Sequence, residues 1–178
     1  TNARPTGHLV FCPLRTKEAP SAIARLIDLG VQPFLVATSI RAIMAQRLVR
    51  RLCSNCKEPG ELSETELRAL RIEASQLGEA NVMRPVGCER CRQTGYKGRT
   101  GIFELFEIDD EVRHMVNDRA STLQLRQRAR ALGLLPLREA GVRKLRSGTT
   151  SAAYAISNPL EDATSVTRLS SLRVGEAR

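Results

Sequence analysis

Apolar positions near the start of the chain follow two different periods. The run from His8 to Cys12 is short, branched and apolar, and Pro13 follows it, which favours a buried strand that ends at the proline. On that strand Cys12 is expected to be a small buried hydrophobe. From Ala19 to Leu29 the apolar residues recur with helical spacing, and Gly30 is a natural helix end. The pattern therefore predicts a strand followed by a helix.

A second and longer apolar stripe predicts a helix over residues 33–51, with Pro33 acceptable in its first turn. The residues of the stripe are Leu35, Val36, Ile40, Ile43, Met44, Leu48 and Val49. Further along the chain, Ser63 followed by Glu66 matches a capping box. This motif predicts the start of another helix.

The remainder of the chain is predicted to form one strand and three helices. The segment 98–106 is typical of a turn and then a strand, with residues 102–106 extended. Cap residues place helix starts near Asp109, Ser121 and Pro136, and helix ends near Gly133 and Gly148. After Thr150 the periodicity fades, and we expect a poorly ordered tail.

Four of the five cysteines form two pairs, Cys53 with Cys56 and Cys88 with Cys91, and 31 residues separate the pairs. Two residues between thiolates let both sulfurs of a pair bind one ion, and two such pairs complete a tetrahedral site with no open position. Zinc is the default occupant, and its role would be structural. Nearby basic residues would offset the negative charge of a zinc tetrathiolate centre: Arg50, Arg51, Lys57, Arg90 and Arg92.

Other interpretations of the cysteines are weaker. Disulfides need an oxidising compartment, which nothing in the sequence indicates. One redox-active dithiol would leave the second pair unexplained, and two matched pairs are improbable as a coincidence. The gap between the pairs exceeds the about 15–20 residues of a compact zinc ribbon. We therefore expect the metal to staple the two ends of a helical insert.

Composition and charge limit the choice of partner without naming one. Apolar residues are 42% and charged residues 26% of the chain, which is a soluble globular composition, and neither a signal peptide nor a membrane span is expected. The net charge of +9 is compatible with nucleic acid, anionic lipid or phosphate-bearing ligands. Aromatic residues are only 3%, however, and nucleic-acid binders often use them for base stacking. Arginine-rich solvated helix faces explain the charge more simply.

Four segments together resemble the C-terminal part of secretion ATPases, the motors of type II secretion and type IV pilus assembly. They are TGHLVFCPLRTKEAP, AQRLVRRLCSNCKEP, GCERCRQTGYKGRTGIFEL and RSGTTS, in the order of that family. The resemblance implies a RecA-like core, a four-cysteine zinc-binding insert and a hexameric ring driven by ATP hydrolysis. It also implies a cytoplasmic protein, peripheral at the inner membrane, that contacts platform proteins of the secretion or pilus system. In this family Cys53, Cys56, Cys88 and Cys91 match the metal ligands.

The resemblance places His8 and Arg15 in the family's His box, a segment that reaches toward the nucleotide. His8 matches the first histidine, whereas Arg15 stands where the second histidine is usual. An arginine can hold a phosphate, but it stays protonated and cannot act as a base at neutral pH. Without the resemblance, His8 would be interpreted as a hydrogen-bonded residue at the start of a strand. No catalytic residue is assigned.

The P-loop pattern G-x-x-x-x-G-K-[ST] is absent from the sequence, so the chain alone is expected neither to bind ATP and Mg²⁺ nor to hydrolyse ATP. The predicted fold class is α/β and helix-rich, a partial RecA-like ATPase core with the metal-binding insert and a C-terminal helical region. We expect four parts: core at 1–52, insert at 53–98, a strand with helices at 99–148, and the tail at 149–178.

Two alternatives stay open at this point. One is a zinc-containing nucleic-acid-binding module, suggested by the charge and the paired cysteines but disfavoured by the long gap and the few aromatics. The other is a degenerate remnant of the ATPase, suggested by Arg15 and by the alanines after Thr150. The sequence alone leaves the particular secretion, pilus or DNA-uptake system open.

Overall fold

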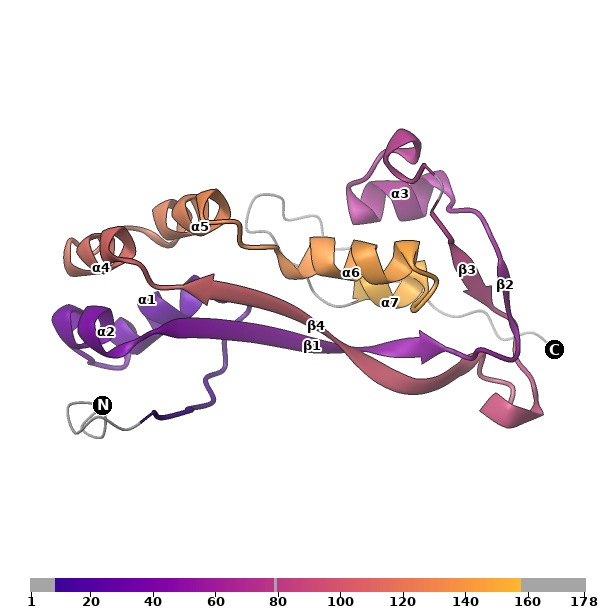
Figure 1. The fold of residues 1–178 in the computed structure, drawn as a ribbon, viewed down its shortest axis with the longest axis horizontal. Helices are drawn as coiled ribbons and strands as arrows, with labels where there is room; N and C mark the ends of the chain where they lie inside the picture. The colour runs from indigo at the N-terminus through magenta and orange to yellow at the C-terminus, as the bar shows by residue number, and fades with distance from the viewer. Residues whose placement is uncertain (1–8, 79, 158–178) are drawn as a thin grey trace.

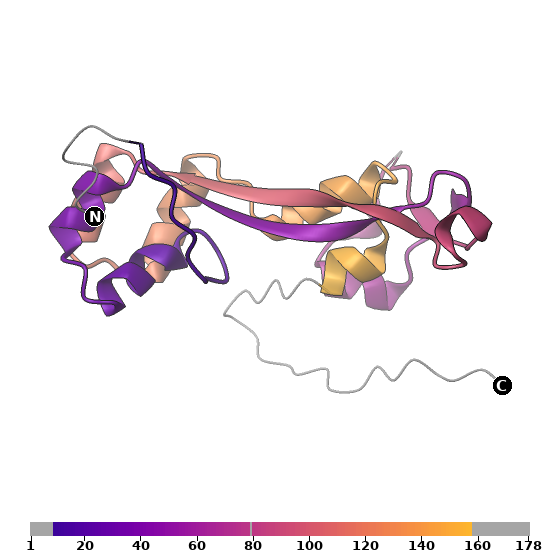
Figure 2. The ribbon, with the colours of Figure 1, turned by 90° about the horizontal axis from the view of Figure 1, so that it is seen from below.

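Two long antiparallel strands run along the molecule and join two groups of helices (Figures 1 and 2). The computed structural model describes residues 9–78 and 80–157. Strand β1 (Ala42–Leu52) pairs with β4 (Tyr96–Glu107), from Ala42 opposite Glu107 to Arg50 opposite Arg99. The register shifts between Arg50 and Leu52, and Leu52 lies opposite Tyr96. We call this pair the ribbon.

The two faces of the ribbon differ in burial. Because side chains alternate along a strand, residues at every second position share a face. One face buries Ala45 and Val49 of β1 with Ile102 and Phe106 of β4. The opposite face also carries large apolar side chains, and these are about half exposed or more: Met44, Leu48, Phe103 and Leu105. The core therefore forms on one side of the ribbon only.

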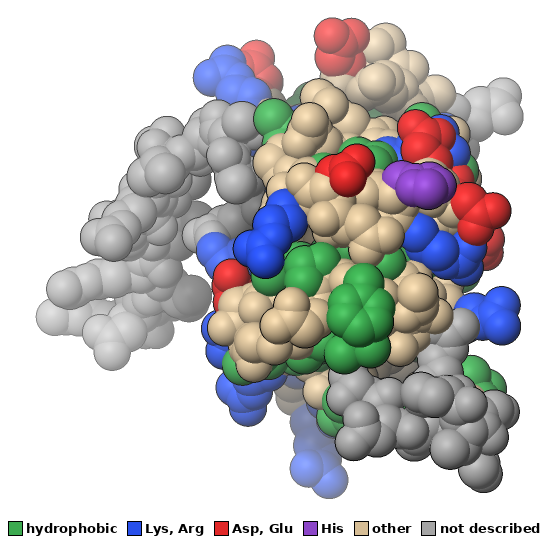
Figure 3. Space-filling view, turned by 90° about the vertical axis from the view of Figure 1, so that its left-hand side faces the viewer, with side chains coloured by type: hydrophobic (Ala, Val, Ile, Leu, Met, Phe, Trp, Pro, Cys, Tyr) green, Lys and Arg blue, Asp and Glu red, His purple; other side chains and the backbone are tan. Residues whose placement is uncertain are grey.

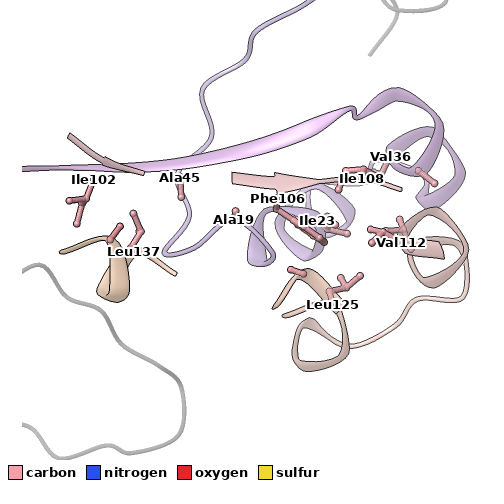
Figure 4. Packing of buried hydrophobic residues seen from close by; sticks show 14 of the residues in the cluster. Ala19, Ile23, Val36, Ala45, Ile102, Phe106, Ile108, Val112, Leu125 and Leu137 are labelled. Atoms are coloured by element: carbon pink, nitrogen blue, oxygen red, sulfur yellow. The ribbon is translucent and has the colours of Figure 1, made fainter. Parts of the chain in front are cut away.

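Four helices pack at one end of the ribbon, which we call the helical end. They are α1 (Ser21–Asp28), α2 (Pro33–Ser39), α4 (Asp110–Asn117) and α5 (Thr122–Ala131). Their apolar faces meet Phe106 in a cluster that includes Ile23, Val112 and Leu125, each no more than 2% exposed (Figure 4). Hydrophobic and charged side chains lie side by side on the outer surface of this end (Figure 3).

The other end, the knuckle end, holds the cysteines. Its elements are β2 (Lys57–Pro59), α3 (Glu64–Leu70), β3 (Met83–Pro85), α6 (Leu137–Arg146) and α7 (Ala152–Ser157), with short 3₁₀ turns at Ala74–Gln76 and Glu89–Cys91. Strands β2 and β3 form a second antiparallel pair. Four buried residues make the apolar cluster here: Leu70, Leu145, Ala152 and Ala155.

Local signals in the sequence placed most of the helices correctly. Ser63 and Ser121 form capping boxes at α3 and α5, and the Asp109 side chain caps α4. Gly133 and Gly148 follow the ends of α5 and α6 with positive φ, as expected for glycines after a helix. None of the helices in the described ranges is long and apolar enough to cross a membrane.

The predicted helix over 33–51 is wrong in its second half. Helix α2 ends at Ser39, and Ala42–Leu52 is strand β1. Met44 and Leu48 of the predicted stripe are exposed, whereas its Val49 is buried on the same face as Ala45, which the stripe did not include. Hydrogen bonding to β4, far along the chain, decides this structure, and a local apolar period cannot reveal it.

The predicted strand at 8–12 is also wrong for its described part. Residues 9–12 belong to no strand, Phe11 is 88% exposed, and Cys12 is exposed rather than buried. An extended segment needs a neighbouring strand to bond with, and the described residues provide none here. His8 lies outside the described residues.

The fold mixes helix and sheet, in agreement with the predicted class. Within the described ranges the sheets are two two-stranded pairs, so a RecA-like core stays a prediction. The expectation of a poorly ordered segment after Thr150 is wrong for its described part, because α7 forms there and buries Ala152 and Ala155. Residues 158–178 lie outside the described residues.

Candidate metal centre

The four paired cysteines meet at the knuckle end. Cys53 directly follows β1 and Cys56 precedes β2, while Cys88 and Cys91 lie between β3 and β4. All four Sγ atoms lie within 4.8 Å of one another. The Sγ–Sγ distances are 3.9 Å for Cys53 and Cys88, 3.8 Å for Cys56 and Cys91, and 3.8 Å for Cys88 and Cys91.

These distances fit a metal bound by four thiolates. Four sulfurs at about 2.3 Å from a tetrahedrally bound zinc ion are about 3.8 Å apart. A disulfide would bring two sulfurs to about 2.05 Å, and all four cysteines are free. The geometry therefore agrees with a closed tetrathiolate site, which leaves no position for a substrate.

The backbone around each cysteine pair forms a tight knuckle. Lys57 N–H donates to the Cys53 carbonyl at 3.0 Å, and Gln93 N–H donates to the Cys88 carbonyl at 2.9 Å. Arg92 and Gln93 both have left-handed backbone conformations, with φ of 54° and 62°. These turns bring the two sulfurs of each pair onto the same side.

Nitrogen donors point at the sulfur atoms. The Gly87 amide donates to Cys56 Sγ at 3.3 Å, and Cys91 Sγ accepts from the amides of Cys88 and Gly95, each at 3.2 Å. Asn55 Nδ2 donates to Cys88 Sγ at 3.5 Å. Such donors stabilise negative charge on sulfur, so they favour the thiolate form that metal binding requires.

The thiols differ in acidity when no metal is bound. Burial raises the pKa of Cys91, but the amides of Cys88 and Gly95 outweigh it, and the pKa falls to about 6. Burial, together with contacts to neighbouring thiols, raises the pKa of Cys56 to about 11. The Gly87 amide has the opposite effect, but it is smaller. The amides of Cys88 and Gly95 therefore favour the thiolate form of Cys91.

Two glycines make the knuckles possible. At Gly95, with φ of 76°, an added Cβ would lie 2.4 Å from Cβ of Pro85. At Gly87, with φ of 117°, it would lie 2.9 Å from the Gln93 carbonyl oxygen. Both positions combine a backbone conformation that favours glycine with a close approach of another segment. The second knuckle needs both.

The knuckles are tied to the turn between α6 and α7. Lys57 Nζ donates to the Gly148 carbonyl at 2.9 Å, and the Leu52 amide donates to the Thr149 carbonyl at 2.9 Å. The buried Thr150 hydroxyl donates to the Arg50 carbonyl at 2.8 Å. The hydroxyls of Tyr96 and Ser151 are 2.7 Å apart. The four-cysteine cluster and helices α6 and α7 are therefore one connected structure.

Two of the five basic residues expected to offset the thiolate charge have other contacts. The Arg50 guanidinium lies over the Tyr96 ring, 5.4 Å from its centroid, and Lys57 bonds to Gly148. Arg51, Arg90 and Arg92 are exposed around the knuckles.

Of the two residues predicted to face the nucleotide, the structure describes Arg15, which is not part of this centre. Arg15 is exposed, and the segment that contains it lies near the helical end of the ribbon, away from the knuckles (Figures 1 and 2). Arg47 of β1 holds the next residues: its Nη2 donates to the carbonyls of Thr16 at 3.2 Å and Lys17 at 3.0 Å.

The sequence interpretation missed Glu104, the only charged residue among the buried ones in the described ranges. It lies between Ile102 and Phe106 on the core face of β4. Alternation along the predicted strand put all three residues on one face, and this signal could have revealed a buried carboxylate.

Comparison with known proteins gives consistent matches. Residues 1–167 match the family of type II/IV secretion system proteins. The chain is 44% identical over 146 residues to the type IV pilus assembly ATPase TfpB of Acinetobacter baylyi, covering 82% of the chain and 25% of that protein. It is 48% identical over 145 residues to the type II secretion system protein HxcR of Pseudomonas aeruginosa, covering 82% and 27%. Type II secretion system protein E of Aeromonas hydrophila is 41% identical over 157 residues, covering 88% and 31%. The chain thus spans only about a quarter to a third of these relatives.

Proposed function

The chain belongs to the type II/IV secretion system protein family, and from this membership we propose that it is a segment of an ATPase motor for type II secretion or type IV pilus assembly. The four-thiol cluster is the observation that carries the proposal for this segment. It supports a structural zinc ion held by Cys53, Cys56, Cys88 and Cys91. The ion would fasten the end of β1 to the segment that leads into β4.

The proposed contribution of the segment is structural rather than catalytic. Its site has four thiolates and no open position, so a bound zinc ion would stabilise the fold without activating water. We propose the division into core at 1–52, insert at 53–98, strand and helices at 99–148, and tail at 149–178. The assembled motor would be a hexameric ring, located in the cytoplasm against inner-membrane platform proteins of its secretion or pilus system.

The nucleotide contacts are proposed for His8 and Arg15. An arginine pairs with phosphate through a planar fork of donors, so Arg15 would act as an anion contact and not as a base. The chain by itself would neither bind ATP tightly nor hydrolyse it, because its sequence has no P-loop. Measurable ATP turnover by the purified 178-residue chain would contradict this part of the proposal.

A chimera tests the proposal as a whole. The 146-residue segment of TfpB that matches this chain would be replaced by the chain itself. We expect the chimera to assemble and to hydrolyse ATP, and we expect Cys91→Ser to remove zinc and impair assembly. Arg15→His provides the matched test of the anion contact, since it restores the usual residue of the family. A folded, zinc-loaded chimera with no ATPase activity in either form would overturn the proposal.

The alternative of a zinc-containing nucleic-acid-binding module is not favoured, since the family match covers most of the chain. A gel shift that weakens steeply as salt rises would be needed to revive it.

A further inference from the structure

Glu104 joins two distant segments of the chain through both oxygens of its carboxylate. Oε1 accepts a hydrogen bond from the Ala19 amide at 2.7 Å, 85 positions earlier in the chain. Oε2 accepts one from the Leu137 amide at 3.1 Å, 33 positions later. The residue lies opposite Ala45, toward the helical end of the ribbon, and is 4% exposed. Glu104 therefore connects the entry to α1 with the first turn of α6.

A carboxylate in this place is costly unless its charge is compensated. Burial raises the pKa of Glu104 above its ordinary value, and the amides of Ala19 and Leu137 offset this only in part. Among the charged groups nearby, Glu18 raises it and Arg126 lowers it. An apolar side chain would avoid the cost of burial but would leave two buried amides without an acceptor. The carboxylate thus does what an apolar residue cannot, because it accepts hydrogen bonds from two segments at once.

Two further contacts hold the same entry segment, residues 16–19. Arg47 donates to the carbonyls of Thr16 and Lys17, as described above. Arg126 of α5 forms an ion pair with Glu18, and about a fifth of each side chain is exposed. Four consecutive residues are thus held from β1, β4 and α5. Arg15 directly precedes these four residues and is exposed.

We propose that Glu104 is a positioning residue that fixes segment 16–19 relative to α6, so that Arg15 is presented at a set place to a phosphate group. The phosphate part rests on the proposed function, in which Arg15 contacts nucleotide. The Arg15 guanidinium needs a fixed backbone position, because a bidentate contact with phosphate depends on geometry. Arg47 and Arg126 hold the same segment, whereas Glu104 holds both this segment and the start of α6.

Hydrogen exchange of the intact, metal-loaded chain tests this positioning role. Glu104→Gln is the informative variant, because its amide keeps one acceptor oxygen and replaces the other with a donor that faces an N–H. We expect exchange of the Ala19 and Leu137 amides to accelerate by about tenfold, which corresponds to one lost hydrogen bond. Exchange in α4 and in the knuckles should stay unchanged.

Two control variants make the result specific. Arg47→Gln should accelerate exchange of the Ala19 amide and leave that of Leu137 unchanged, because Arg47 bonds to Thr16 and Lys17 rather than to α6. Glu107→Gln, at an exposed position of the same strand, should change neither region. A purely structural Glu104 would produce equal acceleration of all protected amides, or acceleration in α6 alone, and either outcome would overturn the proposal. The exchange experiment contains no nucleotide, so a negative result would not contradict the proposed function. An inactive TfpB chimera, in turn, would not alter the exchange result.

Discussion

The helical end and the knuckle end of the ribbon reach stability by different means. Among the described residues, fifteen form the main buried cluster, centred on the helical end, and four form the cluster at the knuckle end. Two of those four are alanines, Ala152 and Ala155, which bury little apolar surface. The knuckle end instead has four converging thiols and a set of hydrogen bonds to the turn before α7.

This difference shows how one chain can hold two folded regions with unequal cores. A small apolar cluster cannot offset the entropy of ordering a long insert, and small protein units commonly use a metal ion for this purpose. The knuckle end should therefore depend on metal and the helical end on packing. The following predictions test that division.

Metal removal should have the largest effect, and it should be confined to one end. Structural zinc contributes on the order of 10 kcal/mol to small zinc domains at neutral pH. We expect a chelator to abolish exchange protection in β2, β3 and α3 while α1, α4 and α5 keep theirs, measured by hydrogen exchange. Uniform loss of protection at both ends, or no loss at all, would refute the division.

Truncating the core of the helical end comes next. Phe106 is 1% exposed, so Phe106→Ala should lower the free energy of unfolding by about 3–5 kcal/mol, measured with urea in the presence of zinc. The matched control is Phe103→Ala on the other face of β4, where the side chain is 50% exposed and the cost should be below about 1 kcal/mol. Equal costs for the two variants would show that the ribbon has no preferred core face.

Two glycines at the knuckle end allow the cost of backbone strain to be distinguished from the cost of a steric clash. Gly95 and Gly98 have nearly equal φ, 76° and 78°, but an added Cβ meets Pro85 only at Gly95. Gly98→Ala should cost about 1–2 kcal/mol from backbone conformation alone. Gly95→Ala should cost about 1–3 kcal/mol more and weaken zinc retention, measured by urea unfolding and by competition with a chelator. Indistinguishable stability of the two variants would contradict the close approach of Pro85.

A smaller, pH-dependent effect belongs to the helical end. The Val112 amide lowers the pKa of Asp109, and Arg128 adds to this against the opposing effect of burial. Because the folded pKa lies below its ordinary value of 3.8, the contribution of Asp109 is present above pH 3.8 and is lost as the pH falls through the folded pKa. The difference in free energy of unfolding between the wild-type chain and Asp109→Asn should shrink in that range. Loss of metal at low pH affects both proteins equally, so it cancels in the difference. A difference that stays constant with pH would rule out this contribution.

The smallest effect is expected for an exposed ion pair at the knuckle end. Arg68 and Glu64 lie one helical turn apart on α3, and their side chains are 80% and 84% exposed. Arg68→Ala should change the free energy of unfolding by less than about 0.5 kcal/mol. A larger loss in urea unfolding would mean that α3 depends on surface charge and not on the metal centre.

Features of the molecule with local causes could be predicted from the sequence. The caps at Ser63, Asp109 and Ser121 depend on residues three positions apart, and the helices start where these residues predict. The spacing within each cysteine pair likewise predicted the knuckles. The meeting of the two pairs was inferred from their repetition, and the structure brings them together.

Features with distant causes could not be predicted. Strand β1 depends on β4, and the apolar stripe at Met44 and Leu48 imitates a helix although both residues are exposed. The role of Glu104 depends on amides of Ala19 and Leu137, which only the folded chain brings to one place. Cys12 shows the opposite error, since an apolar neighbourhood in sequence did not produce burial.

Metal content tests the central claim most directly. We predict one zinc ion per chain in protein purified under reducing conditions without added metal, determined by elemental analysis. Cys91→Ser should retain less than about a tenth of that zinc, whereas Cys12→Ser, at the exposed fifth cysteine, should retain all of it. A folded wild-type chain without bound metal, with all five thiols reactive, would contradict the account.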